Sequence, residues 1–183
     1  MLEKTLLASA QAIGFKRSSS WGASSVTAVF PSLEDDFYGW LLDQAAALKG
    51  QRYSTLDWKN LSEELQATAR TLEQGLENDL EILLTHLLQW HYQPRRRSGG
   101  WQAAIQNARS SIADRLDDSP RLAGKLKKLT NRAYRKARRS AGAAIGLSER
   151  QWEAKFAQSC PWDLSSLRRP DFWPDNEDRR QSA

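Results

Sequence analysis

The sequence has little of the chemistry that catalytic and metal-binding proteins use. One cysteine, Cys160, stands among 183 residues, so no internal disulfide can form. Neither of the two histidines follows a glutamate by three residues, as the Glu-x-x-His motif of helical metal sites requires. The chain also has no glycine-rich phosphate loop and no Cys–His zinc spacing. These absences argue against an enzyme, and we expect no catalytic residue, no metal and no cofactor.

Long apolar runs are missing as well. No stretch approaches the roughly 18 residues that cross a bilayer. The opening residues include Glu3 and lack a sustained apolar core, so they do not predict a secretory signal. Together with the single cysteine, these features predict a cytoplasmic protein that does not contact membranes. Residues 4–33 contain no acid and faintly resemble an organelle transit peptide, although a misassigned start codon or a flexible tail is the favoured interpretation.

Positive charge is concentrated in one part of the chain. The net charge is +5, but residues 91–150 carry 15 bases and 4 acids, whereas residues 37–90 carry 4 bases and 8 acids. The boundary is the string from His86 to Trp101, which includes the triple arginine Arg95 to Arg97. Such asymmetry predicts either an acidic partner or attraction between the two halves.

Apolar residues recur at steps of three and four, which is the period of a helix. We expect helices over residues 37–49, 58–93, 101–116, 120–146 and 149–156. Two forms of the second remain open, because Thr71 to Gln74 offer a capping box and Gly75 weakens a helix interior. It is either one long helix or a hairpin broken near 69–75.

The predicted fold class is all-α, since no alternating strand pattern is present. We expect a single helical bundle of four to six helices over residues 35–174. A flexible N-terminal tail over 1–32 precedes it. An extended C-terminal tail packs its aromatic residues on the bundle, and residues 175–183 form a disordered C-terminus.

Several short motifs together resemble a known bacterial family. They are Asp36 to Leu42, Asn60 to Leu65, His86 to Pro94, Ser98 to Trp101, Asp118 to Pro120, Ala133 to Arg138 and Asp171 to Pro174. Their order and spacing are similar to those of domain of unknown function twenty-nine, a family common in cyanobacteria and proteobacteria. The resemblance covers about residues 35–174. It implies a compact all-helical protein with no established activity, cofactor or catalytic set, and it transfers no functional residue.

The sharpest functional signal is a basic helix. Nine bases and no acid lie between Arg121 and Arg139, and like charges one helical turn apart repel, so this face favours anions. We predict a non-enzymatic protein that binds the backbone of RNA or DNA without reading its sequence. The residues predicted to form this interface are Arg95, Arg96, Arg97, Arg121, Lys125, Lys128, Arg132, Arg135, Lys136 and Arg139.

Two alternatives to nucleic-acid binding remain. In one, the bases pair with the acids of the preceding helix, which are Glu63, Glu64, Glu73, Glu77, Asp79 and Glu81. In the other, the chain is an adaptor or regulatory protein that binds an acidic or apolar protein partner. The sequence does not fix the oligomeric state.

Other candidate residues have a structural interpretation that we favour. His86 with Glu63 or Glu64 is the least implausible catalytic or metal centre, but a histidine bonded to a bundle carboxylate is more typical. Cys160 as a nucleophile has no supporting motif. Trp101 and Tyr134 are candidates for stacking on bases, yet their helical spacing favours core packing. The string Trp90 to Pro94 is either an aromatic surface that binds a partner or, as we favour, a helix end anchored under the following loop.

Overall fold

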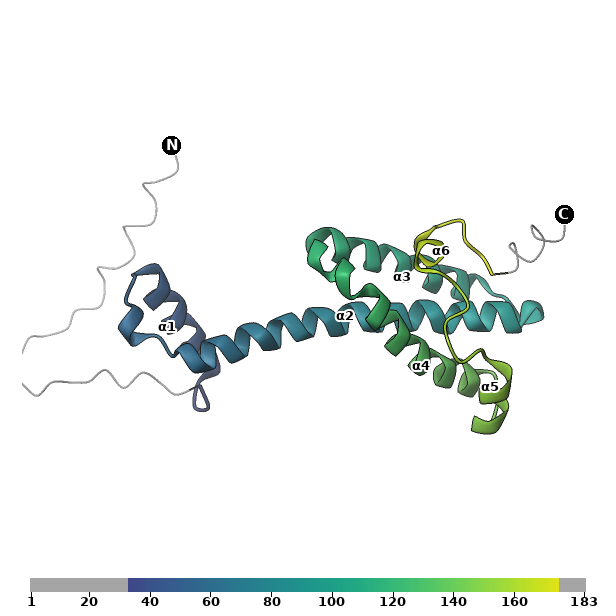
Figure 1. The fold of residues 1–183 in the computed structure, drawn as a ribbon, viewed down its shortest axis with the longest axis horizontal. Helices are drawn as coiled ribbons and strands as arrows, with labels where there is room; N and C mark the ends of the chain where they lie inside the picture. Colours follow the sequence, from purple (N-terminus) through teal and green to yellow (C-terminus); the bar gives the residue numbers. More distant parts are fainter. Residues whose placement is uncertain (1–32, 175–183) are drawn as a thin grey trace, which may run out of the picture. The chain divides into compact units, whose positions relative to one another are not determined.

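The computed structural model describes residues 33–174, which contain helices and no strand (Figure 1). The predicted all-α class is therefore confirmed. The predicted tails over 1–32 and 175–183 lie outside the described residues. The described residues divide into two compact units, 33–57 and 58–174, which we describe separately.

Residues 33–174 contain six α-helices and three 3-10 turns. They are α1 (Phe37–Lys49), η1 (Tyr53–Thr55), α2 (Trp58–Tyr92), η2 (Pro94–Arg96), α3 (Gly99–Asp118), η3 (Pro120–Lys125), α4 (Leu126–Ala144), α5 (Glu149–Lys155) and α6 (Leu164–Arg168).

The first unit contains α1 and η1. Asp36 caps α1, because its side chain accepts a hydrogen bond from the backbone N–H of Gly39 at 2.9 Å. The turn that follows is closed by the buried side chain of Gln44, which accepts a hydrogen bond from the backbone N–H of Asp57 at 2.8 Å. Trp40 is buried and stacks on Phe37. The helix over 37–49 agrees with the sequence expectation.

In the second unit, α2 is one continuous helix of 35 residues, so the hairpin alternative is wrong. Thr71 does not cap a new helix, because its hydroxyl donates to the backbone carbonyl of Ala67 inside the existing one. Gly75 also has a packing role. A Cβ placed there would lie 2.5 Å from a guanidinium nitrogen of Arg115, which passes over this glycine to pair with Asp79.

The bundle forms where α3 and α4 pack against the C-terminal part of α2 (Figure 1). Adjacent leucine pairs on α2, such as Leu83 with Leu84, are fully buried because they face both neighbours at once. The largest fully buried side chains of this unit are Leu76, Leu83, Leu84, Leu87, Leu88, Ile105, Ile112, Leu129, Tyr134, Phe156, Leu167 and Phe172. Burial of such side chains supplies the main driving force for this fold.

Two expectations about the C-terminal half need correction. Ser119 makes no capping hydrogen bond through its side chain, and Pro120 begins the 3-10 turn η3, so α4 begins only at Leu126. The C-terminal tail is not wholly extended, since Asp163 accepts a hydrogen bond from the backbone N–H of Ser166 and starts α6. The short helix α5 is confirmed, with the capping box of Ser148 and Gln151.

Candidate nucleic-acid interface

The basic helix α4 packs on α2 through an apolar face of small and branched residues. Leu126, Leu129, Ala133 and Ala137 are buried, as the apolar spacing of the sequence predicts, and so is Ala141. Leu122 and Ala144, which follow the same spacing, are half-buried and exposed, respectively. The three buried alanines let the backbones of α4 and α2 approach closely. Because this face is fixed against α2, the remaining faces of α4 determine where its bases point.

On one flank of α4 the bases reach across to acids of α2. Lys125 Nζ lies 3.4 Å from a carboxylate oxygen of Glu73. Arg132 and Lys136 lie 3.0 and 2.7 Å from the two carboxylate oxygens of Glu77. For these three predicted interface residues, the alternative of pairing within the chain is confirmed.

The pairing at Glu77 has a clear physical cause. Its side chain is only 2 % exposed, and a buried carboxylate without a partner costs several kcal/mol. Arg132 and Lys136 supply that partner while their own side chains stay about half exposed (45 % and 50 %). Arg132 and Lys136 therefore stabilise the buried carboxylate of Glu77 within the fold, whether or not an external anion binds.

Another base of α4, Arg138, is directed toward α5. Its guanidinium donates to the backbone carbonyls of Glu153 and Phe156 and lies 5.1 Å from the centre of the Trp152 ring. Gly142, one turn further on, allows this contact, since a Cβ there would lie 2.5 Å from the Trp152 side chain. Arg138 thus anchors α5 and is not part of a free basic face.

The other bases of this region are exposed and make no ion pair within residues 33–174. They are Arg121, Lys127, Lys128, Arg135 and Arg139. At about 100° per residue, Lys128, Arg135 and Arg139 lie within about 40° of one another on α4, and we call these three the basic ridge. The paired flank of Lys125, Arg132 and Lys136 is centred about 60° away.

The loop arginines separate into two kinds. Arg95 and Arg96 are exposed in η2, while Arg97 turns back, donating to the carbonyl of Trp90 at 3.0 Å and lying over its ring. The end of α2, which leads into η2, lies well away from the first turns of α4 (Figure 1). Arg97 therefore closes the loop, which confirms the predicted anchoring of the helix end at Trp90.

The aromatic residues offer no stacking platform on α4. Tyr134 is 1 % exposed, and its hydroxyl donates to the carbonyl of Ala157. Burial raises the pKa of the Tyr134 hydroxyl well above its usual value. The favoured interpretation of core packing is confirmed for this residue, and Trp101 is partly buried at the start of α3.

The histidine centre considered from sequence does not form. Glu63 and Glu64 lie on α2 together with His86, at least 22 positions away, which is about 33 Å along a helix. His86 Nδ1 instead lies 2.9 Å from the side-chain oxygen of Gln89, so its partner is an amide and not the expected carboxylate. Within the described residues, no three His, Cys, Asp or Glu side chains come together as a metal site.

Cys160 lacks the environment of a nucleophile. Its thiol is half-buried and donates weakly to the carbonyl of Trp162 at 3.4 Å. Burial raises the pKa of the Cys160 thiol, and a thiol that stays protonated neither attacks carbonyl groups nor binds metals well.

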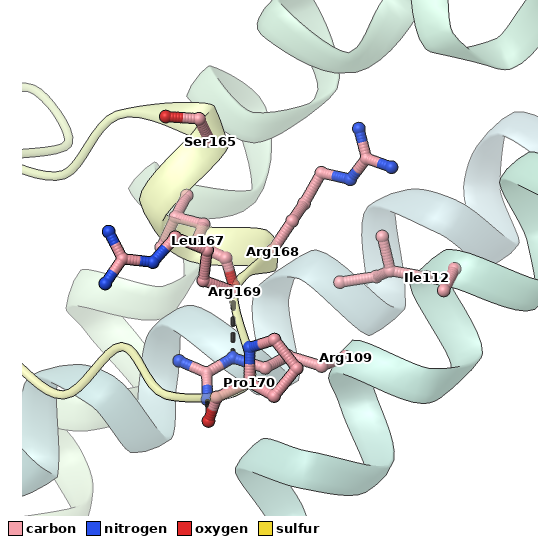
Figure 2. Close-up of a pocket in the computed structure, with 8 residues that line it drawn as sticks. Arg109, Ile112, Ser165, Leu167, Arg168, Arg169 and Pro170 are labelled. Carbon is pink, nitrogen blue, oxygen red and sulfur yellow. Dashed lines mark hydrogen bonds between the residues drawn. The ribbon is translucent and has the colours of Figure 1, made fainter.

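A hollow of about 340 Å³ lies between α3 and the segment around α6 (Figure 2). Three arginines, Arg109, Arg168 and Arg169, contribute to its lining, which suggests an anion site at first sight. Arg109 is 6 % exposed, however, and it donates to the backbone carbonyls of Leu167, Pro170 and Phe172. Arg169 contacts Asp171 at 3.1 Å.

Arg109 is thus a clamp that holds the C-terminal segment on α3. Burial lowers the pKa of its guanidinium, and the nearby Asp171 opposes that change. Sequence reasoning missed this role, although a signal was present. Arg109 occupies a position between Ile105 and Ile112 in the apolar stripe of α3, where a charged residue must find buried partners.

No helix of the described residues has the length and apolar character needed to cross a membrane.

Comparison with known proteins places the chain in a family. No curated protein and no solved structure matches the chain. A family model matches residues 33–173, nearly the whole of the described structure and more than half of the chain. The chain belongs to the family described as domain of unknown function DUF29.

Proposed function

We propose that this chain is a non-enzymatic binding protein whose basic ridge contacts the phosphate backbone of RNA or DNA without reading the sequence. The observation that carries the proposal is the division of bases on α4. Bases on one flank are paired with Glu73 and Glu77, while Lys128, Arg135 and Arg139 are exposed without an ion pair in residues 33–174.

Electrostatics favours phosphates as the ligand of this ridge. Arg135 and Arg139 stand one helical turn apart, so their charges repel and an external anion relieves that repulsion. Lys128 to Arg139 spans about 16 Å along the helix, long enough to follow several phosphates of one strand. Binding releases condensed counterions, which is the main source of affinity for a protein without base contacts.

The proposed interface contains fewer residues than the ten predicted from the sequence. Lys125, Arg132 and Lys136 add positive potential from the side but are already engaged with α2. Arg121 and Lys127 are exposed near the start of α4 but are not part of the ridge, and Arg95 and Arg96 offer separate contacts in η2. Contacts to phosphates carry no sequence information, so we expect little sequence preference.

Binding of a labelled single-stranded RNA and of a DNA duplex, both of mixed sequence, tests the proposal. If the ridge makes three phosphate contacts, affinity for the duplex falls about 40-fold between about 50 and about 200 mM salt. The double variant Arg135→Glu with Arg139→Glu is expected to lose binding.

The matched control is Arg150→Glu with Arg168→Glu, which changes the net charge equally at exposed positions outside the ridge. It should weaken binding only slightly. The proposal fails if the wild-type chain binds neither probe at low salt, or if the two double variants lose affinity equally.

A further inference from the structure

The N-terminal part of α2 has an apolar stripe that the bundle leaves exposed. Trp58, Leu65 and Leu72 expose 59 %, 64 % and 43 % of their surface, and Ala69 is exposed beside a half-buried Leu61. A shallow groove of about 430 Å³ runs along Trp58, Leu61, Leu65 and Ala69. We call these five residues the α2 stripe.

The α2 stripe is as narrow as the seam of a coiled coil. At about 100° per residue its five members fall within about 80° of the helix circumference. A contiguous exposed apolar strip of this kind marks an interaction surface, whereas scattered exposed leucines do not. A helical segment of about 15 residues without packing is only marginally stable in water, so a partner on the stripe would also stabilise the segment.

The spacing of the stripe points to one particular partner. From Trp58 to Leu72, successive members of the stripe are three, four, four and three residues apart. This order of spacings is the same from either end of the stripe, and Leu65 lies at its centre. In an antiparallel pair of such helices, Leu65 meets its own copy, Trp58 lies level with Leu72, and Leu61 lies level with Ala69. Large side chains thus face smaller ones, and the surface is self-complementary, as a two-fold interface requires.

The charges of this segment favour the same partner. Residues 58–72 carry two bases, Lys59 and Arg70, and two acids, Glu63 and Glu64, so the segment is neutral. A strongly acidic or basic partner gains nothing there, and a second copy is not repelled. The antiparallel direction also places the opposite ends of two helix dipoles together. The basic helix α4, with seven bases and no acid, could not pair with itself in this way.

We propose that the α2 stripe is a homodimer interface, in which two copies of α2 pack antiparallel about Leu65. The inference is independent of the basic ridge, because the stripe and the ridge share no residue. The seam is only about 21 Å long, so we expect an association in the micromolar range.

Sedimentation of the full chain from low to high micromolar concentration tests the proposal. The wild-type chain should pass from monomer to dimer, and Leu65→Glu should weaken dimerisation by at least about 100-fold, because it places two carboxylates in an apolar seam. At a concentration where both chains are monomeric, the circular dichroism of Leu65→Glu should match that of the wild type, since Leu65 is exposed and outside the core. The matched control is Ile82→Glu, which changes an exposed apolar residue of α2 outside the stripe and should leave the dimer intact.

Spin labels test the antiparallel direction, in a Cys160→Ser background that leaves one labelled cysteine per chain. Labels at Gln66, beside the two-fold axis, should be much closer between copies than labels at Gln74, which the geometry separates by about 27 Å along the axis. The proposal is overturned if the chain stays monomeric at every concentration. In that case the stripe is covered by another segment of the same chain or by a different protein. A dimer that ignores Leu65→Glu, or equal distances at both label sites, also overturns it.

Discussion

The helix α2 has two segments with the same sequence pattern and different surroundings. In the buried segment, residues 76–88, six leucines expose 2 % of their surface or less. In the exposed segment, residues 58–72, three large apolar residues of the α2 stripe expose more than two fifths of theirs. Both segments repeat apolar residues at steps of three and four. The pattern therefore specifies a helix with an apolar face, but it does not specify what covers that face.

Replacing a leucine by alanine should change the free energy of unfolding far more in the buried segment than in the exposed one. Leu84→Ala removes a fully buried side chain between α3 and α4 and should lower the free energy of unfolding by about 3–5 kcal/mol. Leu65→Ala should change it by less than about 0.5 kcal/mol. Urea unfolding measures both, at a protein concentration where the chain is monomeric. Similar losses for the two variants would show that the exposed segment is packed in solution.

Replacing an arginine by alanine should also have different effects on stability at two places, at the clamp residue Arg109 and at Arg70 in the exposed segment of α2. Arg109→Ala leaves the carbonyls of Leu167, Pro170 and Phe172 without their donor, and we expect a loss of about 2–4 kcal/mol. The C-terminal segment should detach first, which would expose Trp173 and change its fluorescence. Arg70→Ala, at an exposed position of α2, should be neutral within about 0.5 kcal/mol. An equally neutral Arg109→Ala would show that the clamp does not hold this segment.

Replacing a glutamate by alanine should give a smaller difference in stability between the two segments of α2. Glu77→Ala removes the buried carboxylate that Arg132 and Lys136 contact, and both bases can then turn to water because they are half exposed. We expect a loss of about 1–3 kcal/mol, below that of a fully buried pair. Glu63→Ala in the exposed segment should have no measurable effect. Thermal unfolding at two salt concentrations measures both, and a wild-type level of stability in Glu77→Ala would contradict the structural role of this pairing.

Much of the fold could be predicted from the sequence because it depends on local periodicity. Five of the six helices follow from apolar spacing and caps, and the C-terminal aromatics pack on the bundle as expected. The continuity of α2 through Gly75 could not be predicted. Gly75 weakens the helix interior on local grounds, and the packing of Arg115 over that glycine is a contact between residues 40 positions apart. The start of α6 at Asp163 was missed because five residues are too few for a periodic pattern.

The candidate site could be predicted only in part, for a related reason. The sequence shows that α4 carries bases and no acid, yet it does not show which bases meet Glu73 and Glu77. That choice is set by which side of α4 packs against α2. Arg135 and Lys136 are neighbours in sequence but point about 100° apart around the helix, and only Lys136 reaches Glu77. The role of Arg109 likewise depends on carbonyls 58 to 63 positions away.

The smallest predicted effect tests whether the two segments of α2 act as separate folding units. Ala69→Gly lowers helix propensity by about 1 kcal/mol at an exposed position, where no packing compensates. In a monomeric sample, amides near residue 69 should exchange with solvent several-fold faster, whereas amides of the buried segment should keep their rates, because their protection depends on the packing of α3 and α4. Faster exchange along the whole of α2 would mean that the helix opens as one unit. Slower exchange near residue 69 at high protein concentration, in the wild-type chain, would instead show that the second copy supplies the packing that the bundle does not.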